Sequence, residues 1–405
     1  MAGLLLNLAA LLIAAFVGGL IVRRWGYPAV IGELLVGSLI GPYALGFVGD
    51  VEALRLFAEL GAIVLLFYIG LETELVRFVR ALRGAIWVAI LADFTGFAFT
   101  YAASRAMGFP GLEALSLATI TFSTSVGISA RVLKDMDKLH TNVGELVIGA
   151  AVVDSVLAVV LASVVIEMLT ASLKPLNIAA LTLKAVAFWF IVLIIGSTVI
   201  ARILASITIS PETLAVILVA LAFTAAHFAE DVGLPTIIGA LAMGMALSGL
   251  GRNKRMMTYL QALYAFFVPI FFVSSGMMVN WRMFGSKAVA PSLALTGALV
   301  AGTFAGCAVA AYITKLSLSD SLRLGAAMTP RGETCLVIAS IMMARGLIGS
   351  VCYSMSIIMI TLTTVTAPVM LKHMYRLEPS ELLGRFKLIL RRYALKVKGL
   401  RRERG

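Results

Sequence analysis

Two short runs, Thr121-Phe-Ser-Thr-Ser-Val-Gly127 and Gly149-Ala-Ala-Val-Val-Asp-Ser155, decide how this chain folds. Asp154 lies inside an apolar segment, Leu146 to Ile166, that is otherwise long enough to cross a bilayer. A carboxylate at that depth costs about 2.5–3.5 kcal/mol on insertion scales, so it indicates a functional site by default. The alternative is a buried hydrogen bond between helices. We predict that Asp154 is functional.

Composition places the rest of the chain in a bilayer as well. Of the 405 residues, 61% are hydrophobic and 13% are charged, which excludes an ordinary soluble domain. Apolar segments of about 18 or more residues recur from end to end, and they are continuous rather than alternating, as in membrane helices and not in β-barrels. The sequence therefore predicts an all-α polytopic membrane protein. We place about thirteen transmembrane spans at 3–22, 29–47, 53–71, 82–107, 111–133, 142–170, 177–207, 211–229, 234–250, 256–280, 287–316, 321–346 and 348–374.

Cysteine and histidine give no sign of a resident metal or a redox site. The three cysteines fall inside apolar segments, and the three histidines are far apart at segment ends. The chain also lacks a recognisable pair of nucleophile and base, so we predict no cofactor and no enzymatic activity. The residues considered are Cys307, Cys335, Cys352, His140, His227 and His373.

The net charge of +12 could suggest a nucleic-acid partner. The lysines and arginines, however, lie in short loops and a tail beside apolar segments, which favours bilayer orientation and lipid headgroups over nucleic acid. With the amino terminus outside, the inner loops hold these residues in an excess of roughly four to one. We therefore expect a multi-pass protein of the cell membrane with a cytoplasmic carboxyl terminus. The first span begins at Gly3 without a basic region or cleavage site, so we read it as retained.

An internal repeat is the most informative pattern in the chain. Pro28-Ala-Val-Ile-Gly-Glu-Leu-Leu-Val-Gly37 matches Pro235-Thr-Ile-Ile-Gly-Ala-Leu-Ala-Met-Gly244 at a shift of 207 positions, and the match continues to the Ser123 and Thr329 regions. With one span between two six-span copies, the copies have opposite orientations in the membrane. Inverted repeats with broken helices at matching places indicate a secondary transporter with its site at the midplane.

We accordingly expect four parts: a first inverted repeat at 1–176, a linking helix at 177–207, a second inverted repeat at 208–375 and a basic tail at 376–405. Apolar residues recur at helical spacing among the lysines and arginines of the tail. It is therefore expected to form an amphipathic cytoplasmic helix on anionic lipid, either as a plain anchor or in regulation.

The two expected breaks lie near 121–127 and 329–333. In the first, Ser123, Thr124 and Ser125 offer hydroxyl groups beside carbonyl groups that Gly127 helps to free. Helix ends of this kind can coordinate a small cation, and Asp154 follows after one hairpin. The alternative is that these hydroxyl groups only bond to their own helix backbone.

In the second break, Pro330 removes a backbone donor, while Arg331 and Glu333 bring charge into the membrane. These two charges support the break either by pairing with each other or with another helix, or by direct contact with the ion. Other acidic residues lie in spans, and for them we expect structural or vestibular roles at Glu33 and Glu72 and assign none to Asp93.

Several motifs together resemble one family. They are Pro28-Ala-Val-Ile-Gly-Glu-Leu-Leu-Val-Gly37, Ser123-Thr-Ser-Val-Gly-Ile128 with Ala130-Arg-Val-Leu133, Gly149-Ala-Ala-Val-Val-Asp154, Pro269-Ile-Phe-Phe272 and Pro330-Arg-Gly-Glu333. Over residues 5 to 375 the chain resembles the sodium/proton antiporters of the monovalent cation/proton antiporter superfamily, in the branch that also holds potassium-efflux proteins. The resemblance implies thirteen helices with two crossed broken helices, a homodimer, and a core that slides like an elevator.

Two positions depart from that family. The family carries Asp or Asn followed by the ion-binding Asp where this chain has Asp154-Ser155, and electrogenic relatives carry Lys near Thr303. A proton and a cation compete for one buried carboxylate, so loss of the second carboxylate lowers the expected stoichiometry to one proton per cation.

We therefore expect electroneutral exchange of Na⁺, or else K⁺ or Li⁺, for protons. Asp154, Ser155, Thr124, Ser123 and Ser125 are the expected ion-binding residues, with Arg331, Glu333, Thr303 and Pro330 in support. The alternatives are a solute or organic-anion carrier on the same fold, or a homologue that does not transport.

Overall fold

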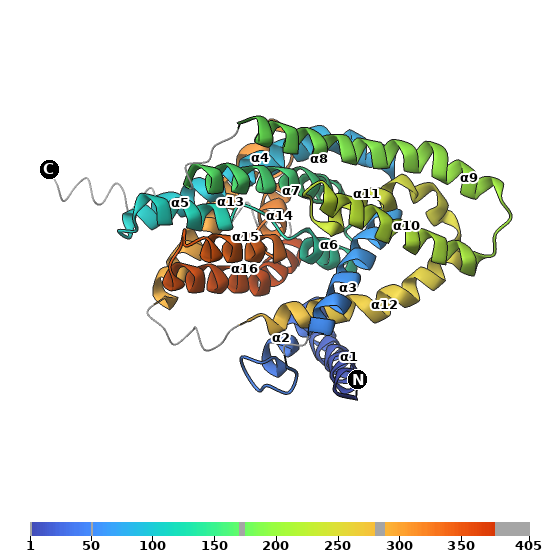
Figure 1. Ribbon diagram of the computed structural model, residues 1–405, viewed down its shortest axis with the longest axis horizontal. Coiled ribbons are helices and arrows are strands. Elements are labelled where there is room, and N and C mark those ends of the chain that lie inside the picture. Colours follow the sequence, from blue (N-terminus) through green and yellow to red (C-terminus); the bar gives the residue numbers. More distant parts are fainter. Residues whose placement is uncertain (1, 50–51, 170–174, 280–287, 377–405) are drawn as a thin grey trace.

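The computed structural model describes residues 2–49, 52–169, 175–279 and 288–376 (Figure 1). The described residues are helical, with connecting turns and loops and no strand. The expected tail at 376–405 lies outside them, apart from Arg376. The α-helices are α1 (Ala2–Arg24), α2 (Ala29–Ile40), α3 (Glu52–Glu72), α4 (Leu75–Ala106), α5 (Gly111–Ile120), α6 (Val126–Asp135), α7 (Asn142–Leu169), α8 (Pro175–Ile195), α9 (Ala201–Ser206), α10 (Pro211–Asp231), α11 (Thr236–Ala246), α12 (Lys254–Met277), α13 (Val289–Ile313), α14 (Leu318–Ala327), α15 (Glu333–Ala344) and α16 (Ser350–Arg376), with a π-helical turn η1 (Gly196–Ile200) and a 3₁₀ turn η2 (Ser248–Arg252).

Helices that can span a membrane recur throughout the described residues. Eight helices in the described residues are long and apolar enough to cross a bilayer, and α2, α5, α11 and the part of α15 from Thr334 to Ala344 are shorter apolar helices. Every predicted span overlaps one or two α-helices, and the spans at 177–207 and 234–250 also include the turns η1 and η2. The all-α membrane fold is therefore confirmed, while the count of thirteen crossings stays a prediction.

The helices follow the predicted repeat. The series α1 to α7 recurs in order as α10 to α16, with η1 and α8 to α9 between the two copies. A Cβ atom on Gly32 would overlap the carbonyl oxygen of Gly18 where α2 meets α1, and a Cβ on Gly239 would overlap that of Ala225 where α11 meets α10. Both glycines permit close helix approach, and the two contacts are related by the same shift of 207 positions.

The two copies also interlock by exchange of equivalent contacts. Gly70 of α3 packs on the carbonyl oxygen of Leu241 of α11, and Gly276 of α12 packs on that of Leu34 of α2. Each repeat therefore offers the other the same pair of surfaces, as expected for repeats related by a pseudo-two-fold axis.

Two broken helices form at the predicted places, and they end for the same reason. Thr121 donates from its hydroxyl to the carbonyl of Leu117, and Thr329 donates to that of Gly325, so both bond back to the preceding turn. Pro330 has no N–H with which to continue α14. The breaks separate α5 from α6 and α14 from α15.

The extended segments between the half-helices cross each other. Ser125 donates its N–H to the carbonyl oxygen of Pro330 at 2.7 Å, and the Thr124 hydroxyl lies 3.1 Å from the carbonyl oxygen of Met328. Ser129 also donates to the carbonyl oxygen of Ala327 at 2.5 Å. The crossed broken helices expected from the resemblance are thus present.

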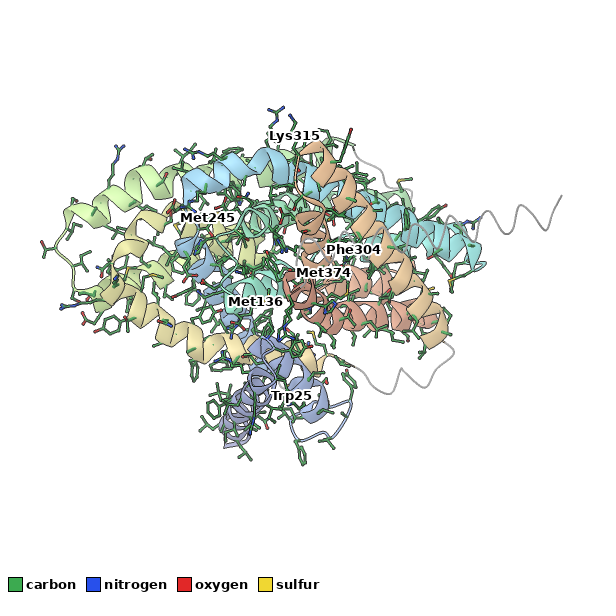
Figure 2. The ribbon with its side chains drawn as sticks, turned by 180° about the vertical axis from the view of Figure 1, so that it is seen from behind. Trp25, Met136, Met245, Phe304, Lys315 and Met374 are labelled. Carbon is green, nitrogen blue, oxygen red and sulfur yellow. The ribbon has the colours of Figure 1, made fainter. Side chains whose placement is uncertain are left out.

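The helices gather in two groups (Figure 1): α1 to α3 with α10 to α12, and α4 to α7 with α13 to α16. Side chains fill the space between them, and Met136 and Met374 lie in the middle of the molecule in Figure 2. Glu33 of α2 pairs with Arg131 of α6 at 3.5 Å, and Glu72 of α3 pairs with Lys134 of α6. Both acidic residues therefore link the two groups, and whether their role is structural or vestibular stays a prediction.

Candidate functional site

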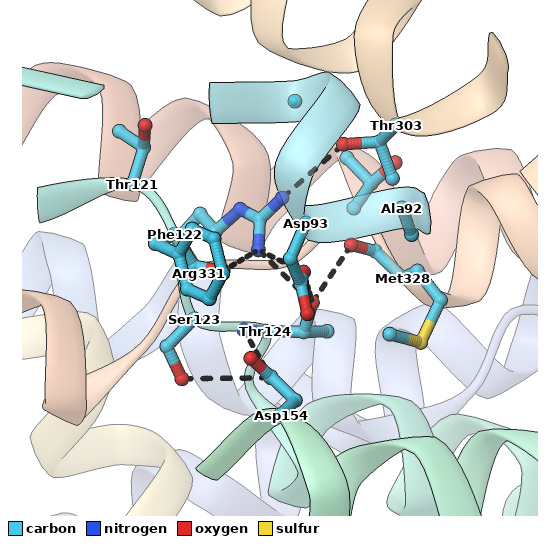
Figure 3. A network of polar contacts seen from close by, with 12 residues as sticks. Ala92, Asp93, Thr121, Phe122, Ser123, Thr124, Asp154, Thr303, Met328 and Arg331 are labelled. Atoms are coloured by element: carbon cyan, nitrogen blue, oxygen red, sulfur yellow. Dashed lines mark hydrogen bonds and ion pairs between the residues drawn. The ribbon is translucent and has the colours of Figure 1, made fainter. Parts of the chain in front are cut away.

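Asp154 lies fully buried on α7, beside the first broken helix (Figure 3). Its Oδ2 accepts the backbone N–H of Thr124 at 2.6 Å and faces the Ser123 hydroxyl at 3.5 Å. Its Oδ1 has no hydrogen-bond partner among the described residues. One carboxylate oxygen is thus held by the protein, while the other is available to a ligand.

Small residues let α7 bring this carboxylate so deep. Ala150, Ala151 and Ala158 are buried around Asp154. A Cβ on Gly149 would lie 2.7 Å from the Cβ of Ala85 on α4, so the two helices touch nearly at their backbones.

The hydroxyl groups predicted as ligands have different surroundings. Ser123 faces Asp154, whereas Ser125 Oγ is buried without a partner among the described residues. A Cβ on Gly332 of the second break would lie 2.6 Å from Ser125 Oγ, so this serine occupies the space that glycine leaves. The Ser155 hydroxyl donates to the carbonyl of Ala151 at 2.8 Å, on its own helix. Its role as an ion ligand stays a prediction.

Arg331 is fully buried at the centre of the crossing. Its Nη1 donates to Thr124 Oγ1 at 2.9 Å and to the carbonyl of Phe122 at 3.4 Å, and its Nη2 donates to Thr303 Oγ1 at 3.2 Å. Arg331 therefore ties the second break to the first. It also donates to Thr303, whose supporting role stays a prediction. The side chain of Glu333 lies outside the described residues.

Asp93 also reaches this centre, although the sequence led us to assign it no role. It is fully buried on α4, and its Oδ1 lies 3.5 Å from Arg331 Nη1 and 3.4 Å from Thr124 Oγ1. The sequence does contain a pattern that indicates burial of Asp93. Ala85, Ala89 and Ala92 precede it on one face of α4, and a face of small residues packs closely on another helix. A carboxylate on that face is bound to be buried.

The two breaks are capped in equivalent ways. Thr124 and Arg331 are 207 positions apart, and each has its backbone N–H capped from the long helix that follows its break. Asp154 of α7 caps Thr124, and the hydroxyl of Thr363 of α16 caps Arg331 at 3.3 Å. Only the first cap carries a charge.

The charges at the centre leave room for one small cation. One arginine and two aspartates carry one net negative charge when all three are ionised. The nearby ligand atoms are carboxylate, hydroxyl and carbonyl oxygens, which hard cations prefer. Asp154 Oδ1 has no donor among the described residues, so the arrangement can bind a dehydrated monovalent cation or a proton.

A pocket of about 420 Å³ lies beside the first half of α7. Its lining includes Glu72, Arg77, His140, Glu145 and Ile148. Ile148 precedes Asp154 by six residues on α7, so the pocket lies toward the amino-terminal end of the helix that carries the buried carboxylate.

Comparison with known proteins gives consistent matches. The sequence profile described as "Sodium/hydrogen exchanger, transmembrane" matches residues 11–377. The Na⁺/H⁺-K⁺ antiporter GerN of Bacillus cereus is 32% identical over 91% of this chain and 95% of its own length. A Na⁺/H⁺ antiporter of Enterococcus hirae is 32% identical over 90% of this chain and 96% of its own length. The solved structure of the sodium proton antiporter MjNhaP1 from Methanocaldococcus jannaschii superposes with a TM-score of 0.68 at 16% identity, over 91% of this chain and 96% of that one.

Proposed function

The chain belongs to the sodium/hydrogen exchanger family, and on that premise we propose that it exchanges a monovalent cation for protons across the membrane. The names of its relatives support Na⁺ first and K⁺ second as the cation. Exchange of this kind is secondary active transport and needs no enzymatic chemistry.

The observation that carries the proposal is the state of Asp154. The carboxylate is fully buried at the crossing of two broken helices, with one oxygen anchored by the Thr124 N–H and one without a donor among the described residues. A proton and a cation can each occupy that oxygen, but not both together. Competition for one carboxylate couples the two fluxes. Ser123, Thr124 and Ser125 supply further oxygen atoms nearby, and Ser155 follows on the same helix.

The charge count supports exchange of one proton for one cation. Arg331 balances one of the two aspartates, so a single monovalent ion or a single proton neutralises the site. Both forms of the site that move then have the same charge, and the membrane potential does no net work on the cycle. We therefore propose that exchange is electroneutral.

Movement of the group that holds Asp154 gives alternating access. The groups defined above meet where α6 faces α2 and α3 and where α16 faces α2. The ion pairs Arg131–Glu33 and Lys134–Glu72 cross that boundary, so a shift of one group against the other has to exchange these contacts. We propose an elevator movement of α4 to α7 with α13 to α16, in a homodimer whose basic tail rests on anionic lipid in the cytoplasmic leaflet.

The test is proton flux in proteoliposomes that contain a pH-sensitive dye. Addition of Na⁺, K⁺ or Li⁺ should move protons in the intact protein, and Asp154→Asn should abolish that flux. Asp320→Asn is the matched control, because Asp320 is a partly exposed aspartate paired with Arg323 and should leave the flux unchanged. An imposed membrane potential should not alter the rate.

The alternatives predict other results. An organic-anion carrier needs an accessible basic cavity, whereas Arg331 is fully buried and engaged by four partner groups. A homologue that does not transport would show no flux with any of the three cations while remaining folded. That result in the intact protein would overturn cation/proton exchange.

A further inference from the structure

Asp93 has an incomplete set of partners for a buried carboxylate. Its Oδ2 has no hydrogen-bond partner among the described residues, and its Oδ1 has only distant ones, Arg331 Nη1 at 3.5 Å and Thr124 Oγ1 at 3.4 Å. The Thr124 hydroxyl has one proton, and the carbonyl of Met328 is the nearer acceptor at 3.1 Å. Asp93 therefore depends on one loose contact with Arg331.

A simple ion pair would have a different geometry. Arg and carboxylate groups that serve as counter-ions commonly form two parallel hydrogen bonds of about 2.7–2.9 Å. Here only one nitrogen of Arg331 faces Asp93, and the other terminal nitrogen donates to Thr303 at 3.2 Å. The free oxygen of Asp93 is consequently not explained by Arg331.

Thr124 brings the two aspartates together. Its N–H holds Asp154 and its hydroxyl faces Asp93, so both carboxyl groups contact the same residue. Each of them also has one buried oxygen with no donor among the described residues. Ionised carboxylate oxygens only accept, so a bound cation can satisfy two of them in one place, and a proton can take its position in the other half of the exchange.

We infer that Asp93 of α4 is a direct ligand of the transported cation and supplies, from another helix, the second carboxylate that the Asp154-Ser155 pair lacks. The inference rests on the proposed exchange. Arg331 then balances the additional charge, so the site has two carboxylate ligands and still takes up only one monovalent cation. The close approach of α4 and α7 at Ala85 and Gly149 fixes the distance between the two ligands.

The first test measures the KM for Na⁺, K⁺ and Li⁺ together with the maximal rate. Asp93→Asn should raise the KM by at least about tenfold, which corresponds to about 1.4 kcal/mol of binding free energy. Asp320→Asn is the control, because it makes the same chemical change at a partly exposed aspartate that pairs with Arg323 and not with Arg331. Its KM should stay within about twofold of the intact protein, which corresponds to well under 1 kcal/mol.

A second variant separates a ligand from a mere counter-ion of Arg331. Asp93→Asn combined with Arg331→Gln removes both charges and leaves the net charge of the site unchanged. If Asp93 binds the cation, the KM of this double variant stays high, and recovery of the original KM would overturn the inference. Asp93→Glu keeps the carboxylate, so it should retain transport with an altered order of preference among the three cations. An unaltered order together with an unaltered KM would also count against the inference.

Binding is measured separately from transport, as the thermal stabilisation of detergent-solubilised protein by Na⁺ relative to choline. Stabilisation of the intact protein that is lost in Asp93→Asn supports the ligand role even if no proton flux is found, in which case only the proposed exchange fails. Normal flux with an unchanged KM in Asp93→Asn overturns the ligand role and leaves the exchange intact.

Discussion

Removal of the buried positive charge at Arg331 should destabilise the protein strongly. Arg331→Gln leaves Asp93 and Asp154 facing each other without their counter-charge in a site that has no exposure to solvent. At the observed separation of 3.5 Å, Coulomb's law gives roughly 5 kcal/mol for the lost attraction with an effective dielectric constant of about 20. Removal of one partner from buried ion pairs costs about 3–5 kcal/mol, and we expect a loss in that range.

Arg323→Gln is the matched control for this substitution. Arg323 and Asp320 form a partly exposed pair at 3.0 Å, for which a loss of at most about 1 kcal/mol is expected. Thermal unfolding of detergent-solubilised protein, followed by intrinsic fluorescence, compares the variants. Addition of Asp93→Asn to Arg331→Gln should recover much of the loss, because it removes the uncompensated charge.

Two outcomes would refute the reasoning. If Arg331→Gln unfolds at the same temperature as Arg323→Gln, the buried charges do not control stability. If the losses of Arg331→Gln and Asp93→Asn simply add in the double variant, the two residues are not energetically coupled. Added Na⁺ should also raise the unfolding temperature of Arg331→Gln more than that of the intact protein, because two unbalanced carboxylates attract cations.

Three further expectations concern the site and the repeat. Ser155→Ala should change the cation KM by less than about twofold, which corresponds to under about 0.5 kcal/mol, because the Ser155 hydroxyl donates a hydrogen bond to the carbonyl of Ala151. A larger increase in the KM would identify Ser155 as a ligand. Gly70→Ala and Gly276→Ala should lower the unfolding temperature by similar amounts, because a Cβ at either position meets backbone atoms of the other repeat. Gly297→Ala is the control and should not lower it, because Gly297 has open space around it. Unequal losses at Gly70 and Gly276 would contradict the equivalence of the repeats. The apparent KM for the cation in flux assays should rise as the pH falls, because protons compete for the same oxygen, and a KM that is independent of pH would contradict competition at Asp154.

The repeat and both breaks could be predicted because their signals are local. Glycines and prolines that recur at one shift mark close contacts and interrupted hydrogen bonding, and these features depend on the backbone of a few neighbouring residues. The structure has the crossed broken helices where the pattern indicated them. Helix ends were less accurate: α4 begins at Leu75 and not at 82, because its first turns carry Arg77 and Arg80 and so do not read as an apolar span.

The partners within the site could not be read from the sequence. Arg331 and Asp93 are far apart in the chain, and only the packing of α4 on α13 beside the second break brings them together. The linking segment was predicted as one helix at 177–207, and the structure has a continuous helix there in which the π-helical turn η1 separates α8 from α9. The place of that turn could not be read from the sequence. The turn η1 packs on α11, where a Cβ on Gly196 would lie 2.5 Å from the Cβ of Ala246. No local sequence pattern reveals this contact.

The equivalent positions Thr124 and Arg331 contribute different charges to the site, one from each half of the chain. At each position a backbone N–H is capped from the following long helix, but the first cap is the charged Asp154 and the second is the neutral Thr363. The first half thus offers a carboxylate of which one oxygen has no donor among the described residues, and the second half carries a cation attached covalently to its own backbone. Such a tethered cation can never leave with the cargo. In the proposed exchange the protein therefore always retains one positive charge at its centre, and only the ion or proton bound by Asp154 changes on each crossing.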